Sequence, residues 1–208
     1  MLELTNEIPS DSELRDYFLA EFAFIVTGEL PPPLGAVASA ELSLAWADFA
    51  RLGGKCFLQS LGESIYASLQ RLNQLPRTDL FWHQTNRRPT VYKLHEFCAL
   101  VLKRNPADSL ALRTTLALSV LQGSAFWGLA QWRQLRAAGA LTVEEVVCQA
   151  IYSELLLGEG EPSATAELFA ELDLVAAAKP LLEECRKSEA KPLHDWGESL
   201  LTELAGTA

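Results

Sequence analysis

The feature that most constrains this chain is the regular spacing of helix-starting and helix-breaking residues between positions 90 and 157. Asp108 and Thr142 are both suited to cap a helix, because their side-chain oxygens accept hydrogen bonds from free N-terminal N–H groups. They lie 34 residues apart, and so do two predicted breaks, Asn105-Pro106 and Gly139-Ala140. Two helices of about fifteen residues repeated at this period form a helical-hairpin array. A single hairpin cannot bury its apolar side, so neighbouring hairpins must stack.

The rest of the chain is also predicted to be helical, since alternation typical of strands does not occur at useful length. Pro31, Pro32 and Pro33 exclude helix from the connector 29–34, and residues 77–89 form either a loop or a short helix. We expect helices at about 10–27, 39–52, 55–72, 91–104, 108–122, 124–138, 142–157, 164–172, 174–187 and 193–204, with Gly53-Gly54 closing the second of them. The predicted fold class is all-α, with an N-terminal helical region (1–76) and a helical-repeat region (77–208) that are either distinct or one continuous domain.

Residues Asn105 to Leu112 resemble the proline-terminated end of one tetratricopeptide repeat and the start of the next. Gly123 matches the turn between paired helices, Gly128 a small-residue position and Trp132 an aromatic position. In the first helix the family's Trp, Gly and Tyr are replaced by Leu112, Leu116 and Ser119. The resemblance covers roughly residues 90–190. It implies antiparallel hairpins stacked as a short solenoid, with the N-terminal helices packed on it and a concave face that binds a peptide or partner helix.

Charge is distributed unevenly along the chain. The formal net charge is -10, but residues 71–136 carry ten basic and three acidic side chains, whereas the segments on either side are acidic. A basic middle segment either docks an acidic partner or binds the chain's own acidic segments, and the third alternative is solvated faces that differ by chance. Net acidity argues against nucleic acid as the partner, because phosphates would be repelled.

Four cysteines occur without a CxxC pair, at positions 56, 98, 148 and 185. Widely spaced cysteines in apolar helical contexts are typical of free thiols in a reducing compartment, so we expect a cytoplasmic protein. The acidic N-terminus does not resemble a signal peptide, and apolar runs such as 19–26 are too short to span a bilayer. We therefore expect no membrane insertion.

Two aromatic and basic segments are candidate partner-binding sites. In the segment 81–88 we assign Trp82, Arg87 and Arg88, because Trp and Arg are frequent hot-spot residues. Two alternatives are nucleic-acid binding and a loop folded onto the core, with its arginines paired to the acidic ends of the chain. In the next segment Trp127 and Trp132 are five residues apart, so one is core and the other is a candidate anchor; we assign Trp127 and Arg133 as partner contacts.

No pattern indicates catalysis, a metal or a cofactor. Gly53-Gly54-Lys55 lacks the earlier glycine and the following Ser or Thr of a phosphate-binding loop. His95 and Cys98 share a predicted helix face, but a metal site needs two further ligands, for which Asp79 and His83 are the nearest candidates. Cys56 follows Lys55 at a predicted helix start, a weak signal for a reactive thiol.

Three functional hypotheses follow. The first is a non-enzymatic adaptor, escort chaperone or assembly factor that binds one protein partner through a helical-repeat groove. The second is an immunity protein that neutralises a bacterial toxin, since an acidic surface can cover a basic catalytic cleft. The third is an enzyme with an unrecognised site built from Cys56, His83 or His95.

Overall fold

The computed structural model describes residues 40–76, 78–85, 88, 90–121, 129–157 and 162–206. Within these ranges the chain is helical and contains no strand, which confirms the all-α class. The helices are α4 (Ala40–Phe49), the kinked segment η1 (Ala50–Gly54), α5 (Lys55–Asn73), α6 (Leu80–Thr85), α7 (Thr90–Arg104), α8 (Ser109–Leu121), α9 (Leu129–Ala137), α10 (Val143–Leu157), α11 (Pro162–Glu171), α12 (Val175–Arg186) and α13 (Lys191–Gly206). Their bounds lie close to the predicted ones, and the helix expected at 10–27 lies outside the described residues.

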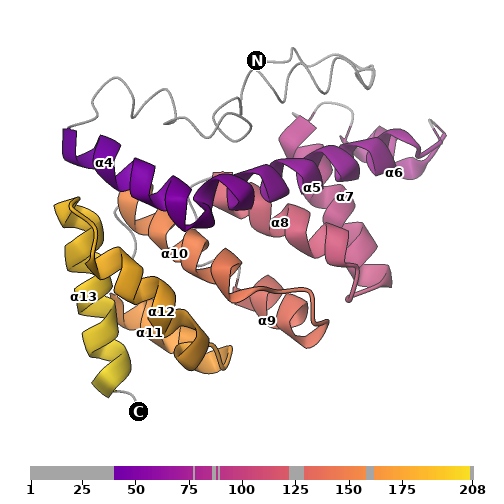
Figure 1. Cartoon of the computed structure of the whole chain (residues 1–208). Coiled ribbons are helices and arrows are strands. Elements are labelled where there is room, and N and C mark those ends of the chain that lie inside the picture. Colours follow the sequence, from indigo (N-terminus) through magenta and orange to yellow (C-terminus); the bar gives the residue numbers. More distant parts are fainter. Residues whose placement is uncertain are drawn as a thin grey trace.

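α4, η1 and α5 together form one long bent rod, which lies along the upper side of the coloured helices in Figure 1. Gly53 adopts a φ of 103°, a left-handed value that favours glycine, and the chain then continues as α5. A side-chain carbon on Gly54 would lie 2.4 Å from the ring of buried Phe49, so only glycine lets this ring pack against the bend. The prediction that Gly53-Gly54 closes one helix before the next begins is confirmed: Gly53 is non-helical, and the two helices meet at a kink there.

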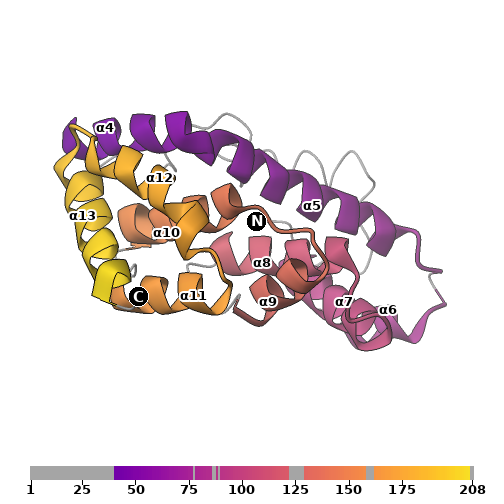
Figure 2. The ribbon, with the colours of Figure 1, turned by 60° about the horizontal axis from the view of Figure 1, so that its bottom comes forward.

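The bent rod runs along the whole helical layer beneath it. Figure 2 shows α6 and α7 at one end of the rod and α13 at the other. α5 packs on α7, α8 and α10, while α4 packs on α10 and α13. The buried apolar side chains form one core cluster that includes residues of the rod and of the helices after residue 76, such as Phe49, Leu58, Leu112, Ile151 and Leu200.

The two predicted N-caps that lie 34 residues apart are both present. Asp108 Oδ1 accepts a hydrogen bond from the Ala111 N–H at 2.9 Å, at the start of α8. At α10 the Glu145 N–H donates to Thr142 Oγ1 and the Thr142 N–H donates to the Glu145 carboxylate, at 3.2 and 3.1 Å, which is a capping box. α9 ends at Ala137, and Gly139 just beyond it has a φ of 64°, a left-handed value common after a helix. Capping and helix-breaking residues therefore determine these helix ends.

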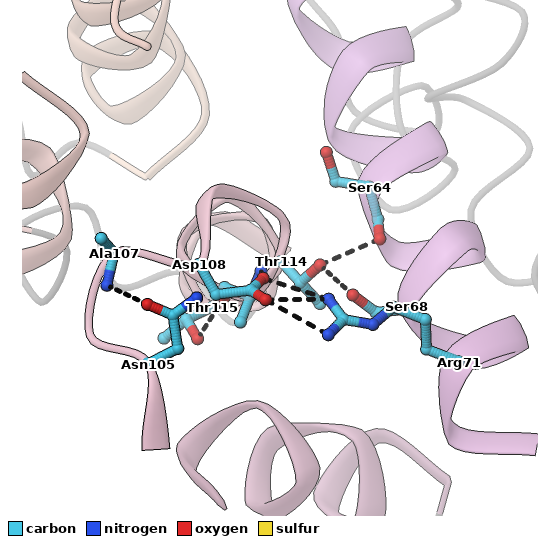
Figure 3. A network of polar contacts seen from close by, with 9 residues as sticks. Ser64, Ser68, Arg71, Asn105, Ala107, Asp108, Thr114 and Thr115 are labelled. Atoms are coloured by element: carbon cyan, nitrogen blue, oxygen red, sulfur yellow. Dashed lines mark hydrogen bonds and ion pairs between the residues drawn. The ribbon is translucent and has the colours of Figure 1, made fainter. Parts of the chain in front are cut away.

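The rod is attached to α8 through polar side chains (Figure 3). Thr114 Oγ1 donates to the Ser64 carbonyl oxygen at 2.9 Å and lies 2.6 Å from Ser68 Oγ. One turn further along α5, the Arg71 guanidinium binds both carboxylate oxygens of Asp108 at 3.1 to 3.2 Å. Because hydrogen bonds are directional, these two contacts set the register of α5 on α8.

None of the helices within the described ranges combines the length and the apolar character that crossing a bilayer requires.

Candidate partner-docking groove

The short helix α6 is anchored to the core by its first residues. The Phe81 N–H donates to Asp79 Oδ1 at 2.9 Å, which starts the helix. Phe81 and Trp82 are both buried, with ring centroids 5.1 Å apart in an edge-on arrangement. The Trp82 indole N–H donates to the Leu75 carbonyl oxygen at 3.4 Å, and the Phe81 ring lies 6.3 Å from that of Phe97 on α7. These contacts hold α6 against α7 and against the turn that follows α5.

The prediction that Trp82 contacts a partner is therefore wrong, because only 7% of this residue is exposed. The alternative in which residues 81–88 fold onto the core describes its aromatic side chains correctly. Of its two arginines, Arg88 lies in the described part of the chain and pairs there with Glu96 on the neighbouring helix α7.

A surface pocket of about 500 Å³ lies between α6 and α7. We call it the α6–α7 groove, and its walls are Phe81, Gln84, Arg88, Glu96, Ala99, Leu100 and Lys103. The ion pair between Arg88 and Glu96 bridges the two walls. Lys103 is exposed near the C-terminal end of α7, where the helix dipole favours positive charge.

Exposed apolar side chains extend both walls of this groove. Leu100 in the wall is 42% exposed. Tyr92 lies one turn before Glu96 on the same face of α7 and is 57% exposed, and Leu80 lies one turn before Gln84 on α6 and is 65% exposed. Among the described residues, a fourth large hydrophobic side chain, Leu44, is exposed to a similar degree (48%), but it lies on α4. Exposed apolar surface is therefore concentrated at the α6–α7 end of the molecule.

The remaining predicted contact residues have different positions. Arg88 lies in the groove wall. Arg133 on α9 is exposed but pairs with Glu171 on α11, which ties two helices together. Arg87 and Trp127 lie outside the described residues. Trp132 is a core residue with 1% of its surface exposed, as expected for one of the two tryptophans at 127 and 132.

Much of the positive charge between residues 71 and 136 binds the chain's own acidic groups. Arg71 pairs with Asp108. Arg113 on α8 binds the Glu145 carboxylate and the Ala140 carbonyl oxygen, which joins α8 to the start of α10. Together with the Arg133 pair, these contacts favour the alternative in which the basic segment holds the chain's own helices together. At the groove, Arg88 is paired with Glu96, and Lys103 adds a further exposed positive charge.

The predicted reactive groups do not assemble into a catalytic site in the described part of the chain. The pocket that Cys56 lines contains neither His83 nor His95, and both histidines are exposed on α6 and α7. Cys98 is fully buried, and burial raises the pKa of its thiol to about 12. Cys98 therefore does not share an exposed helix face with His95, as the predicted metal or thiol site would require. No group of three or more His, Cys, Asp or Glu suited to a metal occurs among the described residues.

Comparison with protein-family models, with curated proteins and with solved structures finds no match.

Sequence reasoning missed Leu80, Tyr92 and Leu100. A signal was present, since Tyr92, Glu96, Ala99 and Lys103 recur at helical spacing. The opposite side of α7 carries Leu94, Phe97 and Cys98, which are buried. Both sides of this helix are partly apolar, so the sequence alone could not tell which side faces the core.

Proposed function

We propose that this protein is a non-enzymatic adaptor or assembly factor that binds a partner protein in the α6–α7 groove. The observation that carries this proposal is the clustering of Leu80, Tyr92 and Leu100 around one open pocket. Exposed apolar patches on soluble domains commonly mark interaction sites, because water contact with them is unfavourable and a partner can remove it. The groove lies between two helices, a geometry suited to a third helix with an apolar face.

The partner that fits best is an amphipathic helix with acidic flanks. Arg88 and Lys103 lie in the groove walls and offer positive charge next to the apolar centre. The chain as a whole carries a net charge of -10, so an acidic helix is repelled by most of the surface and accepted at this end. Charge would thus determine the orientation and the association rate, while Tyr92 and Leu100 supply the buried contact.

We further propose that the stretch from roughly residue 90 to 190 is a degenerate array of tetratricopeptide-like units. The N-caps Asp108 and Thr142 at a spacing of 34 residues support this relation. In this proposal the repeat serves as a scaffold, and the rod formed by α4, η1 and α5 covers one side of it. The binding surface then lies on α6 and α7, at the N-terminal end of the repeat.

The test compares two leucines with similar exposure at opposite ends of the rod. Leu100→Asp places a negative charge in the groove, and Leu44→Asp places the same charge on α4. Both positions are partly exposed, so we expect each variant to fold with nearly unchanged stability. Affinity capture from source-cell lysate, quantified by mass spectrometry, should lose its main captured protein at least about tenfold with Leu100→Asp, the change that about 1.4 kcal/mol of binding free energy produces.

The Leu44→Asp variant should retain that protein. A second pair tests the charge: Lys103→Glu should weaken capture and reduce its salt dependence, whereas Lys191→Glu on α13, also exposed, should do neither. Equal capture by wild type, Leu100→Asp and Leu44→Asp would show that the α6–α7 groove is not the binding site.

A further inference from the structure

A second pocket, of about 370 Å³, lies where the bent rod meets the start of α10. Its lining includes Leu52 and Gly53 of the bend, Cys56 on the first turn of α5, and Cys148 on α10. The structure thus brings together two cysteines that are 92 positions apart in the sequence.

Contacts at the bend place Cys148 of α10 beside the part of the rod that carries Cys56. Cys148 Sγ donates a hydrogen bond to the Leu52 carbonyl oxygen at 3.7 Å. Leu52, Gly53 and Cys56 line the same pocket as Cys148. A side-chain carbon on Gly53 would lie 3.9 Å from Cys148 Sγ, so the bend itself is close to this thiol.

The two thiols differ in access to solvent. Cys56 is exposed, whereas Cys148 is 2% exposed, and Cys98 and Cys185 are fully buried. Burial, followed by the nearby carboxylate of Glu144 and the Cys56 thiol, raises the pKa of Cys148 to about 12. A dissolved oxidant therefore meets Cys56 first, while Cys148 lines the same pocket from its buried side.

We propose that Cys56 and Cys148 are a peroxide-responsive pair that forms a reversible disulfide across this pocket. In the first step the Cys56 sulfur attacks a hydroperoxide, the O–O bond breaks, and Cys56 becomes a sulfenic acid while the peroxide leaves as water or an alcohol. In the second step the Cys148 sulfur attacks the Cys56 sulfur, the S–O bond breaks, and water leaves. The pair loses two electrons and the peroxide gains two. A dithiol reductant reverses the change by exchange.

The disulfide would tie the bend of the rod to α10. The bend contains the one described residue of the rod with a left-handed φ, Gly53, so it is the place where the direction of α4 relative to α5 is set. Both arms contact α10 already. Oxidation would therefore fix the angle between α4 and α5. It would also close a chain loop of about ninety residues, which lowers the conformational entropy of the unfolded chain and so stabilises the folded state.

The experiment uses the reduced full-length protein and hydrogen peroxide at a few equivalents. We expect a probe that reacts with sulfenic acids to label Cys56 at early times. The Cys56–Cys148 disulfide should accumulate later and be detected by mass spectrometry under non-reducing conditions. Two thiols per chain should disappear, and the thermal midpoint should rise by about 5 °C or more, returning on reduction. The proposal does not depend on the α6–α7 groove.

Two variants serve as tests. Cys56→Ser alters an exposed side chain, so the protein should fold, and Cys148 should then remain a thiol after peroxide treatment. Cys98→Ser removes a buried thiol on α7 and should leave the disulfide unchanged. A link between Cys148 and Cys185, whose pKa the Cys148 thiol helps to raise, would overturn the proposal. So would a Cys56–Cys56 dimer, or overoxidation of Cys56 without any link to Cys148.

Discussion

The interface between α12 and α13 and the interface between α5 and α8 are held together by different kinds of contact. α12 and α13 pack with Gly197 facing the backbone of the partner helix, where a side-chain carbon would lie 2.9 Å from Cys185 Cβ and 3.1 Å from the Arg186 nitrogen. Buried Leu182 and Leu200 complete this contact. α5 and α8 instead share the buried hydroxyls of Ser68 and Thr114 and the ion pair of Arg71 with Asp108. One interface is close and apolar, and the other is polar and directional.

The difference follows from how each pair is connected. α12 and α13 are joined by the short turn 187–190, so the chain itself limits how the two helices can slide. Close packing at a glycine is then sufficient to fix them. α5 and α8 are separated in sequence by α6 and α7, and the connection does not set their register. Hydroxyl pairs and a bidentate ion pair select one register out of several that would bury similar apolar area.

The largest expected effect is at the close apolar interface. Gly197→Val should lower the free energy of unfolding by about 3 kcal/mol, because the added carbons meet backbone atoms of α12 that cannot move aside easily. Gly206→Val is the matched control on the same helix, since nothing lies within 4 Å of its side-chain position. We expect it to change stability by less than about 0.5 kcal/mol in urea unfolding. Equal effects at both glycines would show that α12 and α13 are not in close contact at Gly197.

An intermediate effect is expected at the polar interface. Thr114→Val keeps the shape of the side chain but removes the hydroxyl that bonds the Ser64 carbonyl and Ser68. We expect a loss of about 1–2 kcal/mol, because buried polar groups on α5 lose their partner. The double variant Ser68→Ala/Thr114→Val should be less destabilised than the sum of the two single variants, measured by a double-mutant cycle. Strict additivity would contradict the idea that the two hydroxyls act as a pair.

The sequence predicts the helices of both regions and neither of these interfaces. Caps and breakers act on their own few neighbours, so Asp108, Thr142 and Gly139 could be identified from their local context. Ser68 and Thr114 are ordinary helix residues until α5 and α8 are side by side, and nothing in the sequence pairs them. Gly197 lies inside α13 and marks no turn. Glycine is required there because α12 packs too close for a side chain, and the sequence does not show that contact.

The candidate site shows the same limit. The segment 81–88 was recognised by its composition, and Arg88 lies in the groove wall. The composition could not show that Trp82 turns inward to the Leu75 carbonyl oxygen, because an aromatic beside an arginine is equally typical of a core edge and of an interface. The break at Gly53-Gly54 could be predicted, since a glycine pair usually ends a helix. The packing of the Phe49 ring over Gly54 could not, because it appears only once the two helices meet at the kink.

The smallest expected effect separates the charge of Asp108 from its role as an N-cap. Burial alone would raise the pKa of this carboxyl, but hydrogen bonds from Arg71 and from the Ala111 N–H outweigh it and hold the pKa below its usual range. The folded state thus binds a proton less readily than the unfolded state, so the stabilisation is present above about pH 4 and is lost as the pH falls through the folded pKa. Asp108→Asn keeps a capping oxygen and removes the charge. We expect it to be less stable than wild type by no more than about 1 kcal/mol at pH 7, since Arg71 is partly exposed and water screens the pair. Urea unfolding of both proteins between pH 7 and pH 2.5 should show that difference shrinking below about pH 4. A constant difference over that range would mean that the α5–α8 register is set by the hydroxyl pair and the cap, without help from the ion pair.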